Sequence, residues 1–164
     1  MTKEYLVTTL VDEDVPYRDD LFFKKVKKTL TDPEGWRKVA NVKFNVVKPE
    51  IYLKSKSKHK IPIRLSRNKT ISEECGFGLN EKLSCCDMLS KRVWLNYDRW
   101  KNGAKASKLP LGKYRDYMIN HEVGHALGRL HAVCPCVGCP APIMMQHTIT
   151  IGQCVPNNKP LYYE

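Results

Sequence analysis

The chain has 164 residues, a length that suits a single domain able to bury a hydrophobic core. Its apolar content of 42% and charged content of 27% exclude a wholly disordered chain, and no apolar run is long enough to cross a membrane. The formal net charge of +11 favours an anionic partner such as nucleic acid, but the lysine clusters lack the interleaved aromatic residues that single-strand binders use.

The first part of the chain alternates between strand and helix patterns. Residues 5–11 are rich in β-branched side chains and predict a strand. Asp19 and Asp20 are expected to cap a helix that runs to about Leu30, because apolar residues recur there at helical spacing. Apolar and polar residues then alternate over residues 41–47, which predicts a half-buried strand.

The middle of the chain is less regular. Short strands are expected at residues 51–53 and 61–65, on either side of a lysine-rich loop. Residues 67–87 contain cysteines without a clear period and predict an irregular segment, and residues 92–97 predict the next strand.

A long helix is predicted from Leu111 onward, and nothing periodic follows Gly128. Several prolines after that glycine indicate an irregular tail. The order of these elements predicts an α+β fold in which a small, mixed, twisted sheet packs on two main helices.

The segment HEVGHALGRLH, at residues 121–131, has the spacing of a metal site. His121 and His125 are four residues apart, so a helix places both imidazoles on one face, where they can bind one ion. Gly128 can adopt the left-handed conformation that ends a helix, and the turn can bring His131 back as a third ligand. Three imidazoles leave a tetrahedral Zn²⁺ with one open position, as in catalytic zinc sites.

Glu122 directly follows the first of these histidines and can act on a water molecule at the open position without binding the metal itself. Zinc at such a site activates water and polarises a carbonyl group. We therefore expect Glu122 to be the general base that takes the proton from water and passes it to the leaving amine.

This motif resembles the extended zinc signature of the metzincin metallopeptidases at every fixed position. Metzincins also place a methionine-containing turn beneath the metal, and residues 142–146 are similar to that turn. Met144 is the favoured methionine, with Met145 as the alternative. Some metzincins have a tyrosine two residues further on, which acts as a fifth metal ligand or as a donor to the oxyanion. This sequence has Gln146 there, so a tyrosine is not expected to take that role from this position. The resemblance implies a zincin-like fold with one catalytic zinc ion.

A longer resemblance spans nearly the whole chain. It is to a family of zincin-like domains, known mainly from secreted or membrane-anchored actinobacterial proteins and described as a domain of unknown function. The resemblance implies one catalytic domain over residues 1–164, with an upper sheet and helix part at 1–128 and a short lower part at 129–164. It rests on four phrases: DPEGW at 32–36, WLNYDRW at 94–100, YRDYMINHEVGHALG at 114–128 and APIMMQH at 141–147.

Seven cysteines are many for a chain of this length, and disulfides would indicate an oxidising compartment, an exported form or a virus particle. The sequence has no signal-peptide pattern, which points the other way. Cys86 is an alternative partner for Cys75. The candidate disulfide residues, which the same family resemblance includes, are Cys75, Cys85, Cys134 and Cys154, paired in that order.

The C-x-x-C pair of Cys136 and Cys139 has other interpretations. This spacing is also typical of a redox element or a second zinc site, for which His147 is the spare nearby ligand. Cys136 is also a candidate fourth ligand that would block the catalytic zinc. Because seven is odd, at least one thiol stays free or pairs between chains.

Two functions follow as hypotheses. The first is a monomeric zinc-dependent endopeptidase that acts on a peptide or protein substrate. The alternative is a zinc-containing binding or structural module with weak or no catalysis, which binds polyanions through the lysines of residues 24–28 and 48–60.

Overall fold

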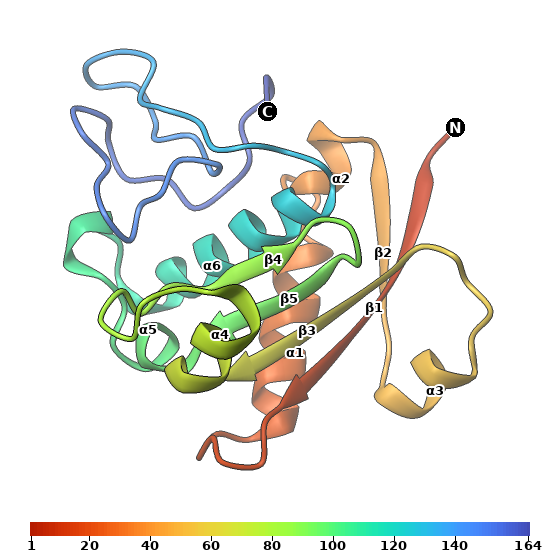
Figure 1. Cartoon of the computed structure of the whole chain (residues 1–164). Coiled ribbons are helices and arrows are strands. Elements are labelled where there is room, and N and C mark those ends of the chain that lie inside the picture. Colours follow the sequence, from red (N-terminus) through yellow and green to blue (C-terminus); the bar gives the residue numbers. More distant parts are fainter.

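A five-stranded mixed sheet lies at the centre of the molecule, in the order β2-β1-β3-β5-β4 (Figure 1). The computed structural model describes residues 1–164. Four strands run parallel, and β4 pairs antiparallel with β5 at one edge. The elements in chain order are β1 (Lys3–Val11), α1 (Asp19–Leu30), α2 (Trp36–Val39), β2 (Val42–Val46), α3 (Pro49–Lys54), β3 (Lys60–Ser66), α4 (Asn68–Cys75), β4 (Cys85–Asp87), β5 (Arg92–Asn96), α5 (Tyr97–Asn102), a 3₁₀ turn (Lys105–Ser107) and α6 (Leu111–Ala126).

The main core lies between the sheet and the two longest helices. In β1 and β3 every second residue is buried against the helices, as the two-residue period of a strand predicts. Helices α1 and α6 contact each other, and they contact different strands of the sheet on the same face (Figure 1). Val7, Ile61 and Leu95 from the sheet meet Phe22 and Ile119 from the helices in one buried cluster. The prediction of an α+β fold with a mixed sheet on two main helices is confirmed.

Two of the local predictions are wrong. The first concerns a short apolar run, which fits both a helix and a strand. Residues 51–53 belong to helix α3, which begins at Pro49, a residue favoured in the first turn of a helix. The segment 67–87 is not irregular throughout, because it contains α4 and the edge strand β4.

The predicted strand at residues 92–97 ends one residue early. The Asn96 side chain accepts hydrogen bonds from the backbone N–H groups of Asp98 (3.0 Å) and Arg99 (3.4 Å) and so caps α5. At α1 the capping position is held by Arg18, and Asp19 instead lies in the first turn, where its carboxylate accepts the backbone N–H of Val11.

The chain after α6 has no further helix or strand, as predicted, apart from one isolated bridge between Pro140 and Val155. It has its own small buried cluster, built around Met145, Ile151 and Cys154. No helix of the structure has the length and apolar composition needed to cross a membrane.

Candidate metal centre

The three histidines of the motif converge at one point. His121 and His125 lie on α6, and one nitrogen atom from each, together with one from His131, fall within 4.8 Å of one another. The Nε2 atoms of His125 and His131 are 3.1 Å apart. The two histidines on α6 lie one helical turn apart on the same face, as their spacing predicts.

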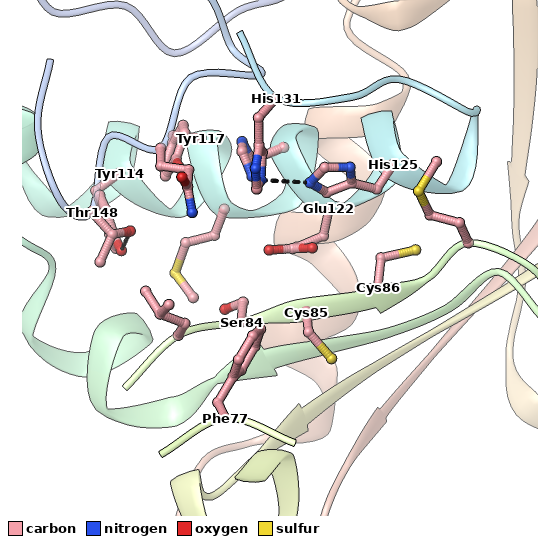
Figure 2. A pocket seen from close by; sticks show the side chains of 15 residues that line it. Phe77, Ser84, Cys85, Cys86, Tyr114, Tyr117, Glu122, His125, His131 and Thr148 are labelled. Atoms are coloured by element: carbon pink, nitrogen blue, oxygen red, sulfur yellow. Dashed lines mark hydrogen bonds between the residues drawn. The ribbon is translucent and has the colours of Figure 1, made fainter. Parts of the chain in front are cut away.

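The third histidine reaches this point because of how α6 ends. Gly128 has φ = +94°, the left-handed conformation in which glycine alone is unstrained. Its N–H donates to His125 O, and the N–H of Arg129 donates to Gly124 O, the paired bonds of a Schellman motif. The motif turns the chain back and brings His131 to the other two histidines, and Figure 2 shows it beside His125.

Backbone carbonyl groups orient two of the imidazoles. His121 Nδ1 lies 2.8 Å from Ile143 O, and His125 Nδ1 lies 2.8 Å from Arg129 O. A carbonyl oxygen only accepts hydrogen bonds, so both Nδ1 atoms carry the proton and both Nε2 atoms present a lone pair. This arrangement is the usual one for histidines that bind a metal through Nε2.

The cluster fits a divalent metal ion. Two ligand nitrogens on a tetrahedral zinc ion are about 3.3–3.4 Å apart, given zinc–nitrogen distances of about 2.0–2.1 Å. The observed separation of 3.1 Å between His125 and His131 is close to this value. Burial lowers the pKa of His121 to about 3, so this imidazole is neutral and able to bind a metal over the physiological pH range.

Glu122 lies beside the histidines and is buried, with 6% of its surface exposed. Its Oε2 atom has no hydrogen-bond partner within the protein, and burial raises the pKa of the carboxyl group to about 8. A buried carboxyl oxygen without a partner is costly unless a ligand, water or ion meets it. Figure 2 shows this carboxylate directed from α6 toward β4, on the side of the cavity.

Met144 lies in the main core, with 2% of its surface exposed. It packs against Gly124, where an added Cβ atom would overlap its sulfur. The same Cβ would come within 2.8 Å of Trp36 Cζ2. Met145, the alternative methionine, instead belongs to the small second cluster. The absence of a side chain at Gly124 therefore lets Met144 approach the metal-site helix.

A cavity of about 270 Å³ opens in front of the histidines. One wall is α6, and the facing wall includes Ser84, Cys85 and Cys86 at β4 (Figure 2). Because β4 ends the strand order, its outer edge has no partner strand. The cavity thus combines a metal-ligand cluster, a buried carboxyl group and a free strand edge.

Several residues that line the cavity were not predicted to belong to the site. Tyr114 and Tyr117 lie one turn apart on α6 and line the cavity. The hydroxyl group of Tyr114 is 2.7 Å from Thr148 Oγ1, and that of Tyr117 donates to Met145 O and accepts the N–H of His147. Both tyrosines matched the helical period, but only the fold brings them to the cavity. Gln146 also lines it.

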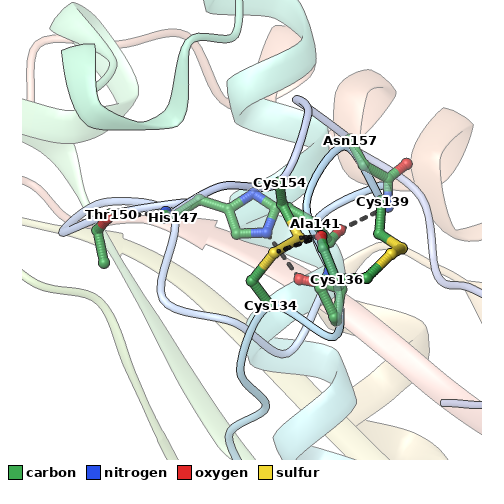
Figure 3. Close-up of a disulfide and its surroundings, with 10 residues drawn as sticks. Cys134, Cys136, Cys139, Ala141, His147, Thr150, Cys154 and Asn157 are labelled. Carbon is green, nitrogen blue, oxygen red and sulfur yellow. Dashed lines mark hydrogen bonds between the residues drawn. A yellow bond between two sulfur atoms is a disulfide. The ribbon is translucent and has the colours of Figure 1, made fainter.

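The structure contains three disulfides: Cys75–Cys85, Cys134–Cys154 and Cys136–Cys139. The first two are the pairs expected from the sequence, and they join the four cysteines that the family resemblance includes. Figure 3 shows the other two side by side in the segment after α6. Disulfides are typical of oxidising compartments.

The metal-binding alternatives for the remaining cysteines are not seen. Cys136 is bonded to Cys139, so it is not a fourth ligand of the histidine cluster. His147 is fully buried and its Nε2 lies 2.7 Å from Pro142 O, so it joins no second metal site. Cys86 is the one free thiol. Burial raises its pKa to about 12, which keeps it protonated.

Residues 4–158 match the model of a family described as "Protein of unknown function (DUF3152)". No curated protein and no solved structure matches the chain. The match agrees with the sequence resemblance to a domain family of unknown function. Because it covers almost the full length, the chain belongs to the DUF3152 family.

Proposed function

We propose that the protein is a zinc-dependent peptidase with a metzincin-like site. The observation that carries this proposal is the convergence of His121, His125 and His131 at the mouth of a cavity that also contains the Glu122 carboxyl group. Three imidazole ligands with space in front of them favour a catalytic ion rather than a structural one. Met144, packed in the main core against Gly124 of α6, fits the same family of sites.

The residues of the chain divide the chemistry between them. His121, His125 and His131 would hold the zinc ion, which when bound supplies Lewis-acid activation of water and of the scissile carbonyl. The positive charge of the bound zinc ion would offset the effect of burial on the pKa of Glu122, so that its carboxylate accepts a proton as the water oxygen attacks the carbonyl carbon. Glu122 then donates this proton to the amide nitrogen as the carbon–nitrogen bond breaks. Glu122 follows His121 on α6, which supports a role in which it acts on this water and does not bind the metal.

The proposed substrate is an extended peptide that adds to the free edge of β4. Backbone groups on that edge have no partner within the sheet, and strand addition would satisfy them. The cavity walls are largely apolar and aromatic, with Phe77 and Leu83 facing Tyr114 and Met118. We therefore expect cleavage next to uncharged, apolar side chains.

A direct test compares the zinc-loaded protein with its Glu122→Gln variant on a broad peptide library. We expect chelator-sensitive cleavage by the parent and at least a hundredfold loss in the variant, which should keep one zinc ion per chain. Glu50→Gln, on the exposed surface of α3, is the matched control and should cleave normally. Fully metallated protein that cleaves no peptide would refute the proposal.

A further inference from the structure

One peptide group beneath the metal site is hydrogen-bonded at both ends. The carbonyl oxygen of Ile143 lies 2.8 Å from Nδ1 of the ligand His121. The N–H of Met144 belongs to the same peptide group and donates to Oε1 of Glu164 at 2.9 Å. A continuous path of hydrogen bonds, here named the relay, therefore runs from the Glu164 carboxylate, through the Ile143–Met144 peptide group, to the imidazole of His121.

The Glu164 carboxylate is fixed in this position by further bonds. Its Oε2 atom accepts the N–H of Ile143 at 3.0 Å and the N–H of Leu161 at 2.8 Å. Three backbone donors thus meet one carboxylate, and hydrogen bonds to a charged acceptor are stronger than neutral ones. These hydrogen bonds connect the last residues of the chain to the turn at residues 142–146, which is not part of any strand or helix.

We propose that Glu164 is a positioning residue for the metal centre and acts on His121 through the Ile143–Met144 peptide group. A peptide whose N–H is bonded to an anion becomes polarised, and its carbonyl oxygen becomes a stronger acceptor. The stronger bond to Nδ1–H fixes the tautomer and the ring orientation of His121 and makes Nε2 a better metal ligand. The inference rests on the proposed function only in that the histidines bind a metal.

The second ligand on α6 provides a contrast within the same site. His125 Nδ1 also bonds to a carbonyl oxygen, that of Arg129. The N–H of that peptide group belongs to Leu130 and meets no carboxylate. The relay is therefore specific to His121, the most buried of the three ligands. Glu164 itself lies outside residues 4–158, which match the family model.

The test measures zinc affinity, without substrate, by competition with a chromogenic chelator. Glu164→Gln preserves the side-chain size but removes the charge, and we expect zinc to bind roughly 10- to 100-fold more weakly. Glu164→Asp keeps the charge and should recover part of this loss. The absorption spectrum of the Co²⁺-loaded protein should shift in the glutamine variant, because the geometry or donor strength of His121 changes.

Asp116→Asn is the matched control for a purely structural effect. Asp116 lies on α6, the helix that carries His121, and bonds to Thr29, Lys25 and Asn158, away from the histidines. This variant should lower the melting temperature while zinc affinity and the Co²⁺ spectrum stay within twofold and unshifted. Unchanged zinc affinity and an unchanged Co²⁺ spectrum in folded Glu164→Gln protein would overturn the proposal.

A measurement on the unmodified protein covers the case in which Glu164→Gln does not fold. Nuclear magnetic resonance of the zinc-loaded protein with ¹⁵N-labelled histidine should show a proton on His121 Nδ1 that exchanges slowly with solvent. A His121 that lacks this proton overturns the relay. These readouts need no hydrolysis, so a protein that binds zinc but cleaves nothing refutes the peptidase proposal while the relay stands.

Discussion

Replacement of Gly124 by alanine tests the packing beneath the metal site. Gly124 is buried on α6, and an added Cβ would overlap the Met144 sulfur and come within 2.8 Å of Trp36 Cζ2. Trp36 has no free space to move into, because it is 1% exposed and its Nε1 donates to Asn120 O at 2.8 Å. The methionine must therefore shift. Gly112 lies in the first turn of the same helix, where a Cβ meets nothing within 4 Å.

The two substitutions should change stability in opposite directions. An alanine that fits its site stabilises by about 0.4–1 kcal/mol, because it restricts the unfolded chain, and this gain applies at Gly112. Overpacking a buried site costs about 1–3 kcal/mol, so Gly124→Ala should lower the free energy of unfolding by about 1–2 kcal/mol after the same gain is included. In a domain of this size, each kcal/mol shifts the melting temperature by roughly 2–4 °C.

Thermal and urea unfolding of the metal-free proteins, followed by circular dichroism, would measure both changes. Chelator must be present, because bound zinc would add its own stabilisation. A Gly124→Ala protein as stable as Gly112→Ala would refute the reasoning, since it would mean that Met144 does not lie against α6 in the folded protein.

Three further outcomes are expected. Replacing both Cys134 and Cys154 by serine should lower the free energy of unfolding by about 3 kcal/mol, as measured by urea denaturation, because the disulfide closes a loop across a sequence separation of 20 residues. Burial lowers the pKa of His147 from 6.5 to about 4, so as the pH falls the unfolded chain takes up a proton on this imidazole before the folded chain does. The metal-free protein should therefore lose about 3 kcal/mol of stability through this group between pH 6.5 and pH 4. In unfolding measured as a function of pH, His147→Gln should reduce the slope of stability against pH. His131→Ala should reduce the rise in melting temperature on adding zinc to near zero, because it removes one of three ligands; an undiminished rise would exclude this histidine as a ligand.

The sequence predicts the parts of this fold that have long, regular patterns. The helices α1 and α6 and the strand β2 follow from the spacing of their apolar residues, and β1 follows from its β-branched residues. Helix α3 could not be distinguished from a strand, because three apolar residues in a row satisfy both periods. Helix α5, which the Asn96 side chain caps, was not predicted, and the three residues of β4 form a strand only because β5 lies beside them.

The candidate site likewise has a part that the sequence predicts and a part that it does not. The spacing of His121, His125 and His131 predicts their convergence because it depends on one helix and one turn. Glu164 gave no signal, because its role depends on three backbone groups that only the tertiary fold brings to it. Local sequence thus specifies the ligands, and long-range contacts specify what holds them.

The two halves of the metal site are stabilised by different means. His121 and Glu122 lie on α6, which is packed in the main core. His131 lies on an exposed segment, and the next residue, Ala132, donates its N–H to Met144 O at 3.0 Å. The turn around Met144 therefore contacts both sides of the site, because the Ile143–Met144 peptide group also bonds to His121 and to Glu164. A metal ion bound by all three histidines would join the core helix to this segment, so metal binding and the order of the segment after α6 must be coupled.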